Sequence, residues 1–138
     1  MDLKLHHVGI VVKDIEHSVQ TYLAMGYELR TAVIHDPVQT AFVQFLRIAR
    51  DSAYIELVSP DGPGSKLANA LQKGGGLNHL CYAIPDIEAG CAWLRERGFM
   101  AIADPVPAVA FGGRRVAWFR GPDRLLVELV ESGAEGEL

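Results

Sequence analysis

The stretch that decides the fold is His7-Val-Gly-Ile-Val-Val-Lys-Asp-Ile-Glu16. It returns 72 residues later, from position 7 to position 79, as His79-Leu-Cys-Tyr-Ala-Ile-Pro-Asp-Ile-Glu88. At the same offset, Ile55-Glu56-Leu57-Val58 matches Val127-Glu128-Leu129-Val130. Each half of the chain therefore carries one histidine near its start and one glutamate in its last apolar run. This pattern indicates a duplicated module.

The repeated polar residues predict one shared metal site made from His7, Glu56, His79 and Glu128. Any one of them alone is more often an ordinary core or surface residue, but a single offset relates all four. A carboxylate on an otherwise apolar strand needs a partner. Two imidazoles and two carboxylates suit Co, Ni, Mn, Fe or Zn, with positions left open for substrate oxygens. His6 is disfavoured as a ligand because its counterpart at this offset is Asn78.

Length and composition predict a single domain over residues 1–138, with module one at about 1–74, module two at about 75–132 and a frayed tail at 133–138. The net charge of −4, without a basic run, argues against nucleic acid or a membrane surface as a partner. No long apolar run and no signal-peptide pattern is present, so we expect a cytoplasmic protein. The two cysteines lack metal-binding spacing and are expected to be buried thiols.

Local patterns predict the order β-α-β-β-β in each half, with an additional helix closing the first, and hence an α+β fold. In module one, strands are expected at 3–12, 27–35, 39–48 and 53–58, and helices at 15–25 and 65–73. In module two, strands are expected at 77–84, 99–103, 114–120 and 125–131, and a helix is expected from the residue after Asp86 to Arg97. Asp14 and Asp86 are placed to cap the two matching helices.

Together, the first histidine stretch, Ile55-Glu56-Leu57, Gly76-Leu-Asn-His79 and Leu126-Val-Glu128-Leu-Val-Glu resemble the vicinal oxygen chelate superfamily (glyoxalase, bleomycin resistance and dioxygenase proteins). Gly112-Gly-Arg-Arg-Val-Ala-Trp-Phe is most similar to the methylmalonyl-CoA epimerase branch. The resemblance implies two tandem βαβββ modules whose curled mixed sheets surround a shared metal cleft. It also implies a divalent metal (Co, Ni, Mn or Zn), a small-molecule substrate such as an acyl-CoA, and a homodimer.

By this resemblance the protein is a metal-dependent epimerase or isomerase that removes a proton alpha to a carbonyl, with Glu128 as the first choice for the base and Glu56 opposite it. Some epimerases carry a further carboxylate on the strand at 39–46, where this chain has none, so a second, non-metal base is not identified. A glyoxalase I-like lactoylglutathione lyase and a non-catalytic, bleomycin-resistance-type binding protein stay open as alternatives. The candidates for substrate binding are Phe42, Gln44, Tyr54, Trp118, Arg114 and Arg115.

Overall fold

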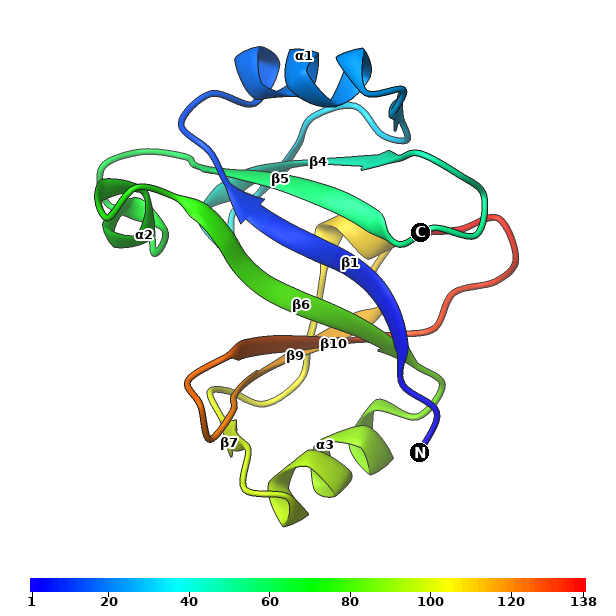
Figure 1. Ribbon diagram of the computed structural model, residues 1–138. Coiled ribbons are helices and arrows are strands. Elements are labelled where there is room, and N and C mark those ends of the chain that lie inside the picture. The colour runs from blue at the N-terminus through cyan, green and yellow to red at the C-terminus, as the bar shows by residue number, and fades with distance from the viewer. The chain divides into compact units, whose positions relative to one another are not determined.

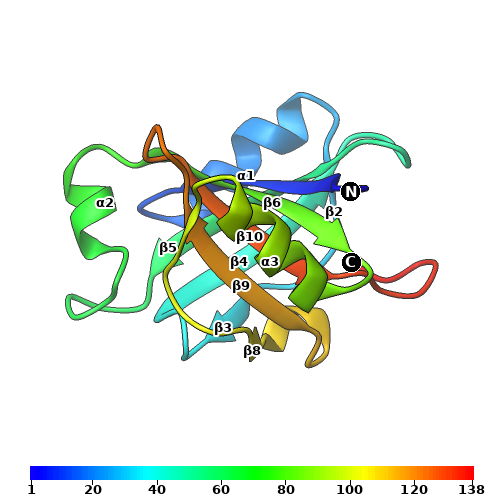
Figure 2. The same cartoon turned by 90° about the horizontal axis from the view of Figure 1, so that it is seen from below.

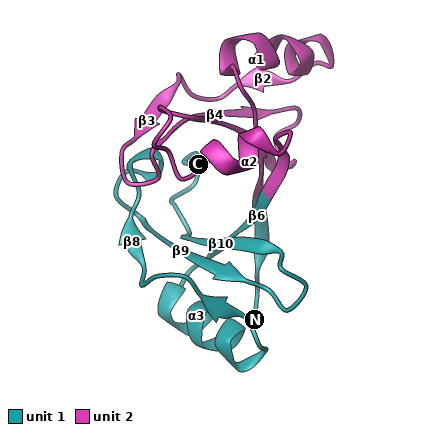
Figure 3. Ribbon diagram, turned by 90° about the vertical axis from the view of Figure 1, so that its left-hand side faces the viewer, with its two compact units in different colours: residues 1–6, 79–138 teal, residues 7–78 magenta.

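The computed structural model describes residues 1–138 and divides into two compact units, coloured separately in Figure 3. Unit 2 comprises His7–Asn78, and unit 1 comprises Met1–His6 together with His79–Leu138. The first strand, β1 (Lys4–Val11), therefore begins in unit 1 and continues in unit 2. The helices are too short and too polar to cross a membrane.

Unit 2 is a mixed sheet covered by one helix. Its elements after β1 are α1 (Ile15–Ala24), β2 (Glu28–Leu29), β3 (Ile34–Asp36), β4 (Ala41–Arg47), β5 (Tyr54–Pro60) and α2 (Ala68–Gln72). The strands lie in the order β2-β4-β5-β1, and β3 also pairs with β4. β1 runs parallel to β5, whereas β4 is antiparallel to its neighbours.

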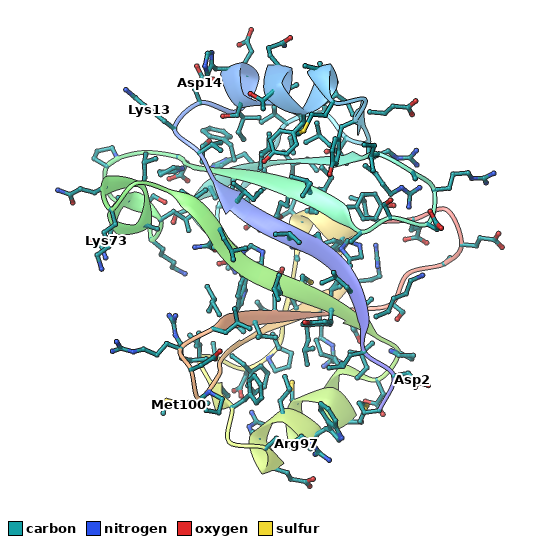
Figure 4. The ribbon with its side chains drawn as sticks, viewed as in Figure 1. Asp2, Lys13, Asp14, Lys73, Arg97 and Met100 are labelled. Atoms are coloured by element: carbon teal, nitrogen blue, oxygen red, sulfur yellow. The ribbon has the colours of Figure 1, made fainter.

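Helix α1 covers one face of this sheet, above β4 and β5 in Figure 1. Asp14, labelled at the start of the helix in Figure 4, accepts a hydrogen bond from the His17 backbone N–H at 3.3 Å, which satisfies one of the free N–H groups of the first turn. The apolar side of the helix, including Ile15, packs against Leu46 and Leu57. One face of the sheet is therefore committed to the hydrophobic core.

Unit 1 repeats the plan. Its elements are β6 (Gly76–Ile84, within unit 1 from His79), α3 (Ile87–Glu96), β7 (Met100–Ala101), β8 (Val106–Pro107), the 3₁₀ turn Val109–Phe111, β9 (Arg115–Arg120) and β10 (Leu126–Glu131). The strand order is β6-β10-β9-β7, and β8 pairs with β9. β6 is parallel to β10, and β9 is antiparallel to β10.

Helix α3 lies across one face of β9 and β10, as Figure 2 shows. The Asp86 carboxylate accepts a hydrogen bond from the Ala89 backbone N–H at 3.0 Å and so caps the start of α3, as expected. The core below the helix includes Ile84, Phe119 and Leu129, all essentially inaccessible to water. As in unit 2, the long helix packs on one face of the sheet.

The α+β class and the tandem βαβββ order are confirmed. Two local expectations need correction. The helix expected at 65–73 begins only at Ala68, because the Ser65 hydroxyl bonds the Thr40 carbonyl and accepts from the Leu67 N–H, which fixes a turn. The stretch at 104–107, which lies outside the strands predicted from the sequence, contains β8, which pairs with β9 through Val106 and Pro107.

Candidate functional site

His7 and Glu56 lie side by side on the face of the unit 2 sheet that α1 does not cover. Gly9 is the register partner of Glu56 in the parallel β1–β5 pair, so His7, two residues earlier, shares the face of Glu56. The His7 Nε2 atom is 3.3 Å from the Glu56 Oε1 atom. His7 is 0% exposed and Glu56 is 7% exposed, so this is a buried polar pair on an apolar sheet.

Unit 1 contains the same pair in the same arrangement. Cys81 is the register partner of Glu128 in the parallel β6–β10 pair, and His79 lies two residues before Cys81. The His79 Nε2 atom is 3.5 Å from the Glu128 Oε1 atom. His79 and Glu128 are both buried. The repeat in the sequence therefore corresponds to a repeat in geometry, with one imidazole and one carboxylate brought together in each unit.

An aromatic ring from the neighbouring antiparallel strand packs against each histidine. Phe45 is the cross-strand partner of Glu56, and its ring meets the His7 ring at 5.2 Å and 78°. Trp118 is the cross-strand partner of Glu128, and its ring meets the His79 ring at 4.8 Å and 76°. Each ring fixes its imidazole from the side, which holds the nitrogen toward the carboxylate.

These donor sets fit a metal ion. Two ligands at right angles around an ion, each about 2.1 Å from it, are separated by about 3 Å, close to the observed distances between histidine nitrogen and carboxylate oxygen. A buried carboxylate beside an imidazole also needs a positive charge or hydrogen bonds to offset its lost hydration. Each unit thus supplies one nitrogen and one oxygen ligand of the kind that first-row divalent metals accept.

Tyr54 and Trp118, two of the residues expected to bind the substrate, lie beside His7 and His79. Tyr54 is the register partner of His7 on the same face, and its ring packs edge-on against Phe45 with the centroids 6.1 Å apart. Trp118 is half-buried beside His79. Phe45 was missed in the sequence because it matches Trp118 at an offset of 73, one more than elsewhere: the loop after β4 is one residue longer than the loop after β9.

Phe42 and Gln44 lie on the other face of the sheet from the His7–Glu56 pair. Because Phe45 pairs with Glu56, Gln44 pairs with Leu57 and points toward the face covered by α1. The Gln44 amide donates to the Thr31 carbonyl at 2.9 Å. Phe42 is partly exposed, and its ring packs near His35. The structure does not bring either residue together with the histidine–glutamate pair of its unit.

Arg114 is occupied within unit 1. Its guanidinium donates to the backbone carbonyls of Phe111, Glu131 and Leu138. It therefore holds the last residues of the chain against the end of β10. Gly133 lies directly over this guanidinium, so close that a Cβ atom there would be 2.6 Å from an Arg114 nitrogen.

Arg115 bridges two acidic side chains on different elements. Its guanidinium donates to Glu88 at 3.0 Å and to Glu131 at 3.1 Å. Hydrogen bonds from the Arg115 side chain and backbone lower the pKa of Glu131. The side-chain hydrogen bonds to Glu131 and Glu88 raise the pKa of Arg115. Arg115 thus links the start of α3 to the end of β10.

Another buried histidine and the two cysteines lie outside the histidine–glutamate pairs. His6 is buried with its ring edge-on to Phe111, 5.4 Å between centroids. Cys81 and Cys91 are buried thiols that form no disulfide, as the sequence led us to expect. His35 lies on the surface with its Nε2 atom 2.9 Å from the Asp61 carboxylate.

Known proteins are similar to this chain in sequence and in fold. Residues 6–118 match the model of the Glyoxalase/Bleomycin resistance protein/Dioxygenase superfamily. An ethylmalonyl-CoA/methylmalonyl-CoA epimerase of Cereibacter sphaeroides is 33% identical over 131 residues, which cover 91% of this chain and 96% of the relative.

Solved structures agree with this assignment. Methylmalonyl-CoA epimerase from Mycobacterium tuberculosis superposes with a TM-score of 0.82 at 27% identity, over 96% of this chain and 89% of that one. A Streptomyces coelicolor methylmalonyl-CoA epimerase in complex with 2-nitronate-propionyl-CoA superposes with a TM-score of 0.83 at 25% identity, over 96% and 100%. The chain therefore belongs to the glyoxalase, bleomycin resistance and dioxygenase superfamily, and methylmalonyl-CoA epimerases are among its relatives.

Proposed function

We propose that this protein is a metal-dependent epimerase of a CoA thioester that carries a carboxylate on its alpha carbon, such as methylmalonyl-CoA. The observation that carries the proposal is the buried histidine–glutamate pair, present once in each unit with nearly equal nitrogen-to-oxygen distances. The epimerases among its relatives support the same substrate class.

In this proposal His7, Glu56, His79 and Glu128 together hold one divalent ion, which is Co, Ni, Mn or Zn. When bound, the ion supplies positive charge that stabilises the negative charge developing on the thioester oxygen as the proton leaves. The imidazoles bind as neutral ligands, and the rings of Phe45 and Trp118 hold them in place.

The proton transfers fall to the two glutamates. The Glu128 carboxylate removes the proton from the carbon between the thioester carbonyl and the carboxylate, which leaves a planar enolate. Glu56 enters the step as the protonated acid and gives its proton to the opposite face of that carbon. The configuration is inverted, and the two glutamates exchange their protonation states in each turnover. Both side chains are buried, so water is kept from the enolate during the transfer, and the glutamate protons exchange with solvent between turnovers.

The test combines metal analysis with hydrogen exchange. We expect the purified protein to retain about one divalent ion per chain and, with Co or Ni added, to catalyse uptake of solvent deuterium into methylmalonyl-CoA. Glu128→Gln should lower the exchange rate by about 10²- to 10⁴-fold, as expected for loss of a general base. Glu131→Gln, on the same strand but bonded to Arg115, is the matched control and should retain exchange.

Absence of exchange in the metal-loaded wild type would refute the epimerase. Formation of lactoylglutathione from methylglyoxal and glutathione would then identify a glyoxalase I-like lyase. Ligand binding without turnover, unchanged in Glu128→Gln, would identify a binding protein. Sedimentation of the purified protein tests the expected homodimer, which rests on the resemblance to the family.

A further inference from the structure

Arg47 lies at the end of a row of side chains that leads to His7. On the face that carries Glu56, the row runs from Arg47 on β4 through Tyr54 on β5 to His7 on β1, since Tyr54 is the register partner of His7 and Leu46 pairs with Ile55. Neighbouring strands are about 4.8 Å apart, so the backbone of Arg47 is about 10 Å from that of His7. Arg47 is therefore within reach of a ligand seated at His7.

The guanidinium of Arg47 lies over an aromatic ring. Its Cζ atom is 4.6 Å from the centroid of the Tyr54 ring. Tyr54 is only 8% exposed, and Phe45 packs edge-on against it, so the ring is a fixed platform. Stacking uses the face of a guanidinium and leaves the N–H groups around its edge available as donors.

No carboxylate of the protein lies within ion-pair distance of Arg47, and its side chain makes no hydrogen bond within the chain. Its neighbour across the strand pair is Glu28, an exposed residue on β2 that forms no ion pair with it. The sequence candidates Arg114 and Arg115 differ in this respect, because the guanidinium of each already donates to groups within the protein. Arg47 combines a fixed position with an unused charge.

The internal repeat supplies a natural comparison. Arg120 occupies the position of Arg47 in unit 1, but the residue in the position of Tyr54 is Leu126, which offers no ring. Arg120 instead donates to the Arg124 carbonyl at 3.0 Å. The arginine recurs in both units, whereas the stacked arrangement is confined to unit 2.

We propose that Arg47, positioned by Tyr54, recognises an anionic oxygen group of the substrate, either its carboxylate or a phosphate of its CoA moiety. This inference rests on the proposed function, because it assigns the CoA thioester substrate to the His7–Glu56 face. It gives the substrate a direction, with an anionic group directed toward β4 of unit 2.

The experiment measures the affinity of the metal-loaded protein for 2-nitronate-propionyl-CoA by calorimetry. A charged hydrogen bond contributes about 1.5–3 kcal/mol, so Arg47→Met should weaken binding about 10- to 100-fold and reduce its dependence on salt. Arg47→Lys should recover part of the affinity, since it restores the charge without the planar fork. The matched control Arg120→Met should bind like the wild type.

A second measurement identifies the anion. The exchange assay is repeated with methylmalonyl-pantetheine, which keeps the carboxylate and lacks the nucleotide phosphates. A rise in KM for Arg47→Met that persists with this substrate assigns the contact to the carboxylate, and a rise that disappears assigns it to a phosphate.

Failure of this inference is distinguishable from failure of the proposed function. If the wild type does not bind the analogue, the proposed function fails. If the wild type binds it and a folded Arg47→Met variant, checked by its melting temperature, binds equally well, the role of Arg47 is refuted. An equal loss of affinity in Arg120→Met would also refute the role of Arg47, because the position of Arg47 over the Tyr54 ring would then make no difference to binding.

Discussion

Replacement of Gly90 by alanine tests how tightly α3 is packed on its sheet. Gly90 lies inside α3, where alanine would normally stabilise the helix by about 0.5–1 kcal/mol. A Cβ atom at this position, however, would be 2.7 Å from the Ile84 Cδ1 atom and 3.2 Å from the Leu129 Cδ1 atom. Normal contacts between carbon atoms are about 3.5–4.0 Å, so both methyl groups would have to move.

The two effects oppose each other, and the structure indicates which is larger. Ile84 is 2% exposed and Leu129 is 0% exposed, so neither side chain has free space into which it can move. Overpacking of such a core costs about 1–3 kcal/mol, more than the gain in helix propensity. We therefore expect Gly90→Ala to lower the free energy of unfolding by about 1–2 kcal/mol.

The assay is urea denaturation followed by circular dichroism, with thermal melting as a second measure. The expected loss corresponds to a fall in Tm of about 3–8 °C for a chain of this size. Ser18→Ala, at the matching position of α1 in the other unit, is the control and should be neutral or stabilising by up to about 0.5 kcal/mol. If Gly90→Ala raises stability as Ser18→Ala does, the packing argument is wrong.

Three further predictions follow from the contacts around α3 and β10. Because the hydrogen bonds from Arg115 lower the pKa of Glu131, the stability that this contact contributes should be present at neutral pH and lost as the pH falls through the folded-state pKa of Glu131. The difference in Tm between the wild type and Glu131→Gln should therefore narrow below about pH 4, and a difference that stays constant would contradict this. Burial raises the pKa of Cys91, so iodoacetamide at pH 8 should modify this thiol much more slowly in the folded protein than in urea, as mass spectrometry of the tryptic peptide would show. Loss of the cap to the Ala89 N–H in Asp86→Ala should lower stability by about 1 kcal/mol in the same urea assay, and Asp86→Asn, which can still cap the helix, should lose less.

The repeat in the sequence was sufficient to find the four polar residues because it acts through strand geometry. The parallel register places Gly9 opposite Glu56. Because side chains alternate along β1, His7, two residues before Gly9, lies on the same face as Glu56. The same geometry operates on β6 and β10. The capping aspartates were equally accessible, because a cap depends only on residues within one turn of the helix.

Contacts between residues distant in sequence were not predictable in this way. The side of the sheet that Gln44 faces depends on the pairing of β4 with β5, which is set by a loop one residue longer than its counterpart. The partners of Arg115 are Glu88 and Glu131, which tertiary packing brings to it from two other elements. A basic pair in the sequence does not reveal whether its charges are already satisfied.

The division of the chain into two units has a consequence for expressing it as two fragments. Residues Met1–His6 belong to unit 1, although they precede the whole of unit 2. A gene split at Gly75, where the sequence repeat restarts, would therefore encode an N-terminal piece that carries six residues of the other unit and a C-terminal piece that lacks them. Neither fragment would therefore contain a complete unit.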